Sequence, residues 1–133
     1  MIYSLSDIAA KLYSWDDDFR PVLARGGYDV LSYAHLRHLE AARSLGTVLI
    51  VTVTPDRFVN KGAGRPIFNE NIRAEMLAAL RCVDYVAISE YPTAVEDIQA
   101  LLPAVYVKGD EYRNKMTPML LAEKQAIEAI GGE

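Results

Sequence analysis

The chain has 133 residues, of which 51% are hydrophobic and 24% charged, and its net charge is −4. This length suits one globular domain with one core, and the acidic balance argues against a general nucleic-acid partner. The only cysteine, Cys82, cannot form an intrachain disulfide and is interpreted as a small core residue. We find no signal peptide and no apolar run near the roughly 20 residues of a membrane span, so we expect a cytoplasmic protein without a membrane partner.

Five segments have the pattern of helices. Residues 5–14 carry apolar side chains on one face after Ser4, a favourable N-cap. Three more predicted helices cover residues 34–45, ended by Gly46, residues 69–81, and residues 93–102, where Thr93 and Glu96 have capping-box spacing. The fifth begins with Thr117 and Pro118 and ends at Gly131-Gly132. In the 69–81 helix the predicted buried face consists of Ile72, Met76, Leu77 and Leu80.

Four apolar segments rich in β-branched residues lie between these helices and predict strands at 21–25, 47–54, 83–88 and 104–108. The alternation predicts an α/β fold, a Rossmann-like three-layer α/β/α arrangement around a parallel sheet with right-handed crossovers. We assign residues 1–133 to a single domain, with 1–20 as an N-terminal helix and linker and 21–133 as the α/β core.

Ligands of such sheets bind beyond the carboxyl ends of the strands, which makes the residues after each strand candidates for a site. After the first strand, Gly26 and Gly27 allow a tight backbone path, and a helix begins near Tyr33 or Ala34 with His35 in its first turn. The free N–H groups of that helix start suit a phosphate. An ordinary tight turn is the alternative interpretation.

Two further strand ends carry cations. The loop 55–66 contains Arg57, Lys61 and Arg65, and it either closes over a polyphosphate or is a solvated surface loop. Lys108 and Gly109 follow the fourth strand beside Asp110, where the lysine either meets a ligand or forms a surface ion pair.

The run Gly26-Gly27-Tyr28-Asp29-Val30-Leu31-Ser32-Tyr33-Ala34-His35 resembles G-x-F-D-x-x-H-x-G-H, the opening motif of the cytidylyltransferase-like nucleotidylyltransferases. The likeness is greatest to the heptose 1-phosphate adenylyltransferase group and extends over nearly the whole chain. Segments 64–66, 73–86, 107–110 and 122–132 also look like that group.

The resemblance implies a HUP-type nucleotidylyltransferase fold. It also implies an activity in which a sugar or polyol phosphate attacks the α-phosphate of ATP or CTP and pyrophosphate leaves, with Mg²⁺ as the usual cofactor and no metal site built from the chain alone. A homodimer is expected. The catalytic residues implied by match are His35, Lys61 and Ser32. The implied nucleotide- or phosphate-binding residues are Gly26, Gly27, Tyr28, Asp29, Ala34, Lys108, Gly109 and Asp110.

Three departures from the family pattern bear on activity. Ser32 stands where the motif has its first histidine, and a hydroxyl cannot carry positive charge. Ala34 replaces the motif glycine, and the final strand and helix of the family are expected to be missing. The sequence therefore leaves two hypotheses: an active nucleotidylyltransferase, or a degenerate member that binds a nucleotide or phosphate, regulates or dimerises. The absence of G-x-G-x-x-G makes a redox dinucleotide-binding module a poor third.

Overall fold

The computed structural model describes residues 2–12, 19–59, 66–108 and 118–132, with the backbone alone for 118–120. Its sheet contains four parallel strands in the order β3-β2-β1-β4. Their bounds are β1 (Pro21–Gly26), β2 (Val48–Val53), β3 (Tyr85–Ile88) and β4 (Val105–Val107). The predicted parallel α/β sheet is confirmed, and all four strands fall within the predicted segments to within one residue.

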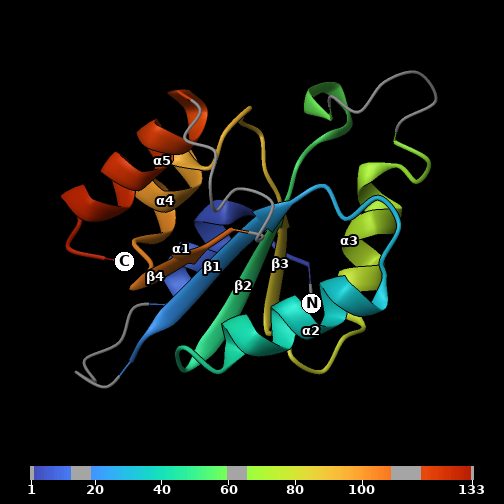
Figure 1. Cartoon of the computed structure of the whole chain (residues 1–133), viewed down its shortest axis with the longest axis horizontal. Helices are drawn as coiled ribbons and strands as arrows, with labels where there is room; N and C mark the ends of the chain where they lie inside the picture. The colour runs from blue at the N-terminus through green and yellow to red at the C-terminus, as the bar shows by residue number, and fades with distance from the viewer. Residues whose placement is uncertain (1, 13–18, 60–65, 109–117, 133) are drawn as a thin grey trace.

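Helices cover both faces of the sheet, as Figure 1 shows. One face carries α2 (Tyr33–Arg43) and α3 (Glu70–Ala78). The other carries α1 (Leu5–Lys11), α4 (Val95–Leu101) and α5 (Pro118–Ala129), and a short 3-10 helix, η1 (Asp56–Phe58), follows β2. This is the predicted three-layer arrangement. Thr117, the predicted N-cap of the last helix, lies outside the described residues.

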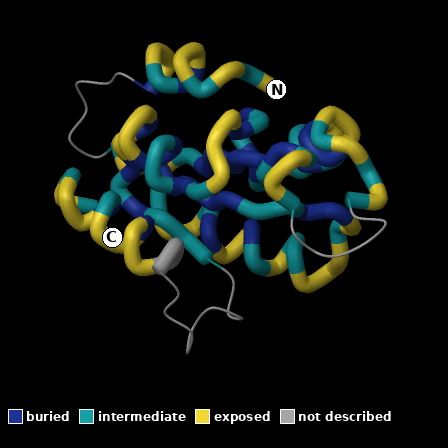
Figure 2. Tube along the Cα trace, turned by 90° about the horizontal axis from the view of Figure 1, so that it is seen from above, coloured by how far each residue is buried: buried dark blue, intermediate teal, exposed yellow. Residues whose placement is uncertain are grey.

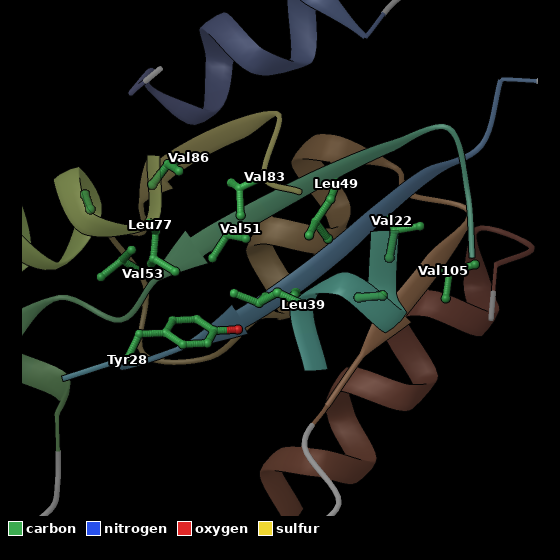
Figure 3. Close-up of a cluster of buried hydrophobic side chains, with 13 residues drawn as sticks. Val22, Tyr28, Leu39, Leu49, Val51, Val53, Leu77, Val83, Val86 and Val105 are labelled. Carbon is green, nitrogen blue, oxygen red and sulfur yellow. The ribbon is translucent and has the colours of Figure 1, made fainter. Parts of the chain in front are cut away.

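Among the residues that the structure describes, the core consists of two apolar clusters, one on each face of the sheet. Along β1 the side chains alternate between them, since Val22 and Ala24 pack under α2 and α3 whereas Leu23 packs under α1, α4 and α5. Figure 3 shows the first cluster, in which Leu39 of α2 and Leu77 of α3 lie over the strands. Figure 2 shows that buried residues run along the strands and exposed ones along the outer sides of the helices. Burial on both faces explains why these strands read as continuous apolar runs.

Cys82 lies close to where the sequence placed it. Cys82 is half-buried and packs against the α2/α3 cluster, and burial raises the pKa of its thiol, which suits the predicted packing role. His38, the other histidine of α2, is half-buried.

The predicted buried face of α3 is partly wrong. The residues of this helix that are buried are Arg73, Ala74 and Leu77, whereas Ile72 is 41% exposed. The face is displaced because the Arg73 guanidinium occupies the interior, where it meets several backbone carbonyls.

The predicted capping box at Thr93 and Glu96 is also wrong. Helix α4 begins at Val95. Its N-cap residue is Ala94, which makes no side-chain capping hydrogen bond. Instead the Ala94 N–H donates to the Glu123 carboxylate of α5 at 2.7 Å, and the Thr93 hydroxyl accepts the Val95 N–H. A distant carboxylate has replaced the local cap.

Candidate functional site

The carboxyl ends of β1, β2 and β3 lie at one edge of the sheet. In register, Gly26 pairs with Val53 and Val53 with Ile88. Thr54 then donates its N–H to Gly26, and Ser89 donates to Val53, so the chain leaves all three strands at the same level. This edge is the predicted location of the site, and Figure 1 shows the loops that leave it.

A fully buried arginine, Arg73, organises the α2/α3 side of this edge. Its Nη1 donates to the carbonyls of Gly27 at 2.7 Å and Thr54 at 2.8 Å, the first residues after β1 and β2. Its Nε donates to the Phe68 carbonyl, and its Nη2 forms an ion pair with Asp56. One cation thus fixes both strand-end loops and the segment before α3, and its buried charge is fully partnered.

A second buried arginine, Arg25 on β1, organises the opposite side. Its Nη1 lies 2.7 Å from both Ser89 Oγ and Asp97 Oδ2, and its Nη2 donates to the Tyr91 carbonyl at 2.7 Å. The Ser89 hydroxyl also donates to Asp97. Asp97 is fully buried, so the pair anchors the loop between β3 and α4 beneath the sheet edge.

Asp29, the aspartate of the motif-like run, braces the neighbouring loop. Its two carboxylate oxygens accept the backbone N–H groups of Ile67 and Phe68 at 2.8 and 2.9 Å, and the residue is buried. Asp29 therefore joins the loop after β1 to the segment before α3, and its predicted contact with a nucleotide stays a prediction.

The left-handed residue of the loop after β1 is Tyr28, with φ +50°, not one of the two glycines. Its ring is buried over Gly26, where a Cβ atom would lie 2.9 Å from Tyr28 Cε2. Gly27 has open space around its Cα. Gly26 therefore makes room for the Tyr28 ring, which Figure 3 shows extending toward Leu39, and burial raises the pKa of the phenol.

Ser32 and His35 form a reciprocal cap at the start of α2. The Ser32 Oγ accepts the His35 backbone N–H at 3.3 Å, and the Ser32 backbone N–H donates to His35 Nδ1 at 3.1 Å. The edge of one ring meets the face of the other where His35 packs against Tyr28, with centroids 5.6 Å apart. Ala34 is exposed in the same helical turn. The structure thus brings Gly26, Tyr28, Ser32 and His35 together.

Lys108, after β4, is tied to α5. Its Nζ lies 3.3 Å from Oε1 of Glu123, whose side chain is 1% exposed. The other carboxylate oxygen of Glu123 accepts the Ala94 N–H, so this residue links β4, α4 and α5. The predicted site residues Lys61, Gly109 and Asp110 lie outside the described residues.

Within the described part of the chain, no group of three or more histidine, cysteine or acidic side chains could hold a metal ion. The carboxylates of Asp29 and Asp56 in the loops after β1 and β2 are engaged, Asp29 by backbone N–H groups and Asp56 by Arg73. In the same ranges no helix combines the length and the apolar character that crossing a membrane requires.

Sequence reasoning did not single out Arg73, Asp97, Ser89 or Glu123. The sequence did carry a signal for Arg25, because an arginine within a strand that is buried on both faces needs a buried partner. Its partner Asp97 is 72 residues away in the sequence, and no local pattern identifies it.

The arrangement is that of an α/β domain in which the loop after β1 leads into the first turn of α2. A model of the cytidylyltransferase-like family matches residues 23–129. The chain belongs to this family.

Curated relatives include the bifunctional protein HldE of Geotalea uraniireducens, 40% identical over 115 residues, which are 85% of this chain and 23% of the relative. HldE of Helicobacter pylori strain P12 is 43% identical over 107 residues, 79% of this chain and 23% of the relative. The chain thus spans about a quarter of the length of the curated relatives it matches.

Solved structures that share the fold include two that cover most of this chain. The lipopolysaccharide core biosynthesis protein of Thermoplasma volcanium superposes with a TM-score of 0.70 at 26% identity, covering 85% of this chain and 89% of that one. Pantothenate synthetase of Thermus thermophilus superposes with a TM-score of 0.61 at 18% identity, covering 98% and 58%, which supports the fold alone. The HUP-type nucleotidylyltransferase fold expected from the sequence is confirmed.

Proposed function

We propose that the chain is a nucleotidylyltransferase domain that transfers a nucleotidyl group from ATP or CTP to a sugar phosphate and releases pyrophosphate. The observation that carries the proposal is the position of His35, held by Ser32 and Tyr28 in the first turn of α2, the helix that follows β1, within a chain of the cytidylyltransferase-like family. The resemblance of the sequence to the heptose 1-phosphate adenylyltransferase group, together with the HldE relatives, favours a sugar phosphate over a polyol phosphate.

The proposed reaction is a direct displacement. An oxygen of the acceptor phosphate forms a bond to the α-phosphorus, the bond from that phosphorus to the bridging oxygen of the β-phosphate breaks, and pyrophosphate carries away the electron pair. No covalent bond to the protein is made. The contribution of the protein is then orientation and stabilisation of charge on the phosphate oxygens.

His35 is the best-placed described residue for a phosphate contact. Its Nδ1 is engaged by Ser32, while its Nε2 has no hydrogen-bond partner among the described residues. By contrast, the buried cations Arg25 and Arg73 are paired with Asp97 and Asp56. We propose that those arginines shape the edge and that His35, together with Lys61, meets the nucleotide.

Mg²⁺ is proposed as the cofactor that enters bound to the triphosphate. Because Asp29 and Asp56 are already engaged, the described residues fit a metal held mainly by phosphate oxygens and water, which is how Mg²⁺ is commonly bound. When bound, the ion would neutralise charge on the phosphates.

Two further parts of the proposal are cytoplasmic location and a homodimer. The expected absence of a signal peptide supports the first, and the family resemblance supports the second. Sedimentation velocity at several protein concentrations tests the second, because a dimer gives a sedimentation coefficient clearly above that of a 14.8 kDa particle.

Calorimetric titration with ATP and with CTP, each with Mg²⁺, tests the proposed function. We expect saturable binding of one nucleotide in preference to the other, and weaker binding by His35→Gln. The matched control is His38→Gln, which removes the other histidine one helical turn away and should bind as the wild type does. If neither nucleotide binds at millimolar concentration, the proposal fails and the degenerate-member hypothesis replaces it.

A further inference from the structure

The contacts between Ser32 and His35 assign a role to Ser32 that differs from a phosphate ligand. We propose that Ser32 is a positioning residue, which holds His35 as the tautomer protonated on Nε2 and so presents that N–H at the sheet edge. That this N–H meets a nucleotide phosphate rests on the proposed function; the tautomer itself does not.

The tautomer of His35 follows from the fact that the Ser32 backbone N–H is the donor in the contact between the two residues. The Ser32 backbone N–H can only donate, and it lies 3.1 Å from His35 Nδ1. Nδ1 must therefore accept, and a neutral imidazole that accepts at one nitrogen carries its proton on the other. The Nε2–H is then a donor with no partner among the described residues.

The Ser32 hydroxyl is turned toward its own helix. Its Oγ accepts the His35 backbone N–H at 3.3 Å and lies 3.2 Å from Nδ1. This cap keeps Ser32 in the extended conformation, φ −122° and ψ 171°, which directs its backbone N–H at the ring. Side chain and backbone thus cooperate, and both act through His35.

The other side of the imidazole is held by Tyr28. The two rings lie 5.6 Å apart at 75°, and the Tyr28 ring is in turn fixed by burial over Gly26. Between Ser32 and Tyr28 the imidazole has little freedom to rotate about χ2, and a rotation would remove Nδ1 from its donor. A single tautomer in a single orientation is the consequence.

Nitrogen-15 NMR of the imidazoles in the full chain tests the assignment without any ligand. The protein has two histidines, and His38→Gln leaves His35 as the sole signal. In the wild type we expect His35 to be a single tautomer with the proton on Nε2. In Ser32→Ala we expect a mixture of both tautomers. Ser32→Thr keeps the hydroxyl, and we expect its His35 to match the wild type.

The matched control is Ser4→Ala. Ser4 is also a serine N-cap whose side chain accepts a backbone N–H, but it caps α1 on the opposite face of the sheet. We expect it to leave the His35 tautomer unchanged. A wild-type His35 protonated on Nδ1, or a Ser32→Ala spectrum identical to that of the wild type, would overturn the proposal.

Addition of ATP or CTP with Mg²⁺ then tests the ligand. We expect the bound nucleotide to shift the His35 Nε2 resonance, and Ser32→Ala to weaken binding by roughly twofold to tenfold, the effect of one ordinary hydrogen bond. Ser32→Thr should stay close to the wild type. If a nucleotide binds without a shift of the Nε2 resonance, the Nε2–H does not donate to it and that part of the proposal is overturned. If the wild-type protein binds neither nucleotide, the proposed function is contradicted, whereas the tautomer result stands.

Discussion

The Nη2 of Arg73 lies 2.6 Å from Oδ1 of Asp56, which joins a fully buried guanidinium on α3 to the 3-10 helix after β2. The same guanidinium donates to the carbonyls of Gly27 and Thr54. The loops that leave β1 and β2 therefore depend on one side chain, and removing it should have both structural and functional effects.

We expect Arg73→Met to lower the free energy of unfolding by about 3–5 kcal/mol, because it leaves buried carbonyls and a carboxylate without their donor. Urea denaturation measures this. The control is Arg37→Met, which removes an exposed pair with Glu40 and should change stability by less than about 0.5 kcal/mol. Equal losses in the two variants would contradict the bracing role of Arg73.

The buried pair of Arg25 and Asp97 should behave as a unit. Asp97→Leu leaves the Arg25 charge buried without its carboxylate, and we expect a loss of about 3–5 kcal/mol in unfolding free energy. The double variant Arg25→Met with Asp97→Leu removes both charges and should recover much of that loss. Strictly additive losses would show that the pair is not coupled.

The two glycines after β1 should respond differently to a methyl group. Gly26→Ala places a Cβ 2.9 Å from the buried Tyr28 ring, and overpacking of this kind costs roughly 1–3 kcal/mol. Gly27→Ala meets nothing within 4 Å. We expect the first variant to lose stability and the second to keep it. A Gly27→Ala protein that is the more damaged would refute this account of the turn.

The alkaline stability of the protein should depend on Tyr28. Burial raises the pKa of its phenol in the folded state above the ordinary value of 10.0, so the unfolded chain loses that proton at lower pH. The contribution of the Tyr28 phenol to the free energy of unfolding is therefore fully present below pH 10 and is lost as the pH rises above that value. Tyr28→Phe should flatten the fall of unfolding free energy above that pH, measured by denaturation at a series of pH values. An unchanged slope would mean that the phenol ionises freely in the folded protein.

The strands and most helices were predictable because their burial is simple. β2, for example, is buried on both faces and consists almost wholly of β-branched and aliphatic residues. This composition is typical of a central parallel strand. The order of the strands in the sheet was not predictable in the same way. It depends on the pairing of β4 with β1, which no local sequence pattern encodes.

The misplaced details share one cause, a polar group satisfied by a distant partner. The face of α3 is displaced because Arg73 finds its acceptors in two other loops, and the start of α4 is set by Glu123, 29 residues further along the chain. Ser32 is a different case, because the motif comparison identified it as a departure whereas its reciprocal cap joins it to His35, only three residues away, and depends on backbone geometry.

The central claim is that His35 serves a nucleotidyl transfer, and pyrophosphate release tests it most directly. The purified chain would be given ATP or CTP, Mg²⁺ and a panel of sugar 1-phosphates, alongside His35→Gln and the control His38→Gln. We expect release that requires a sugar phosphate, falls by roughly 10²–10³ in His35→Gln, as when a donor to developing charge is removed, and is preserved in His38→Gln. Release that is equal in both variants, or that needs no acceptor, would contradict the account.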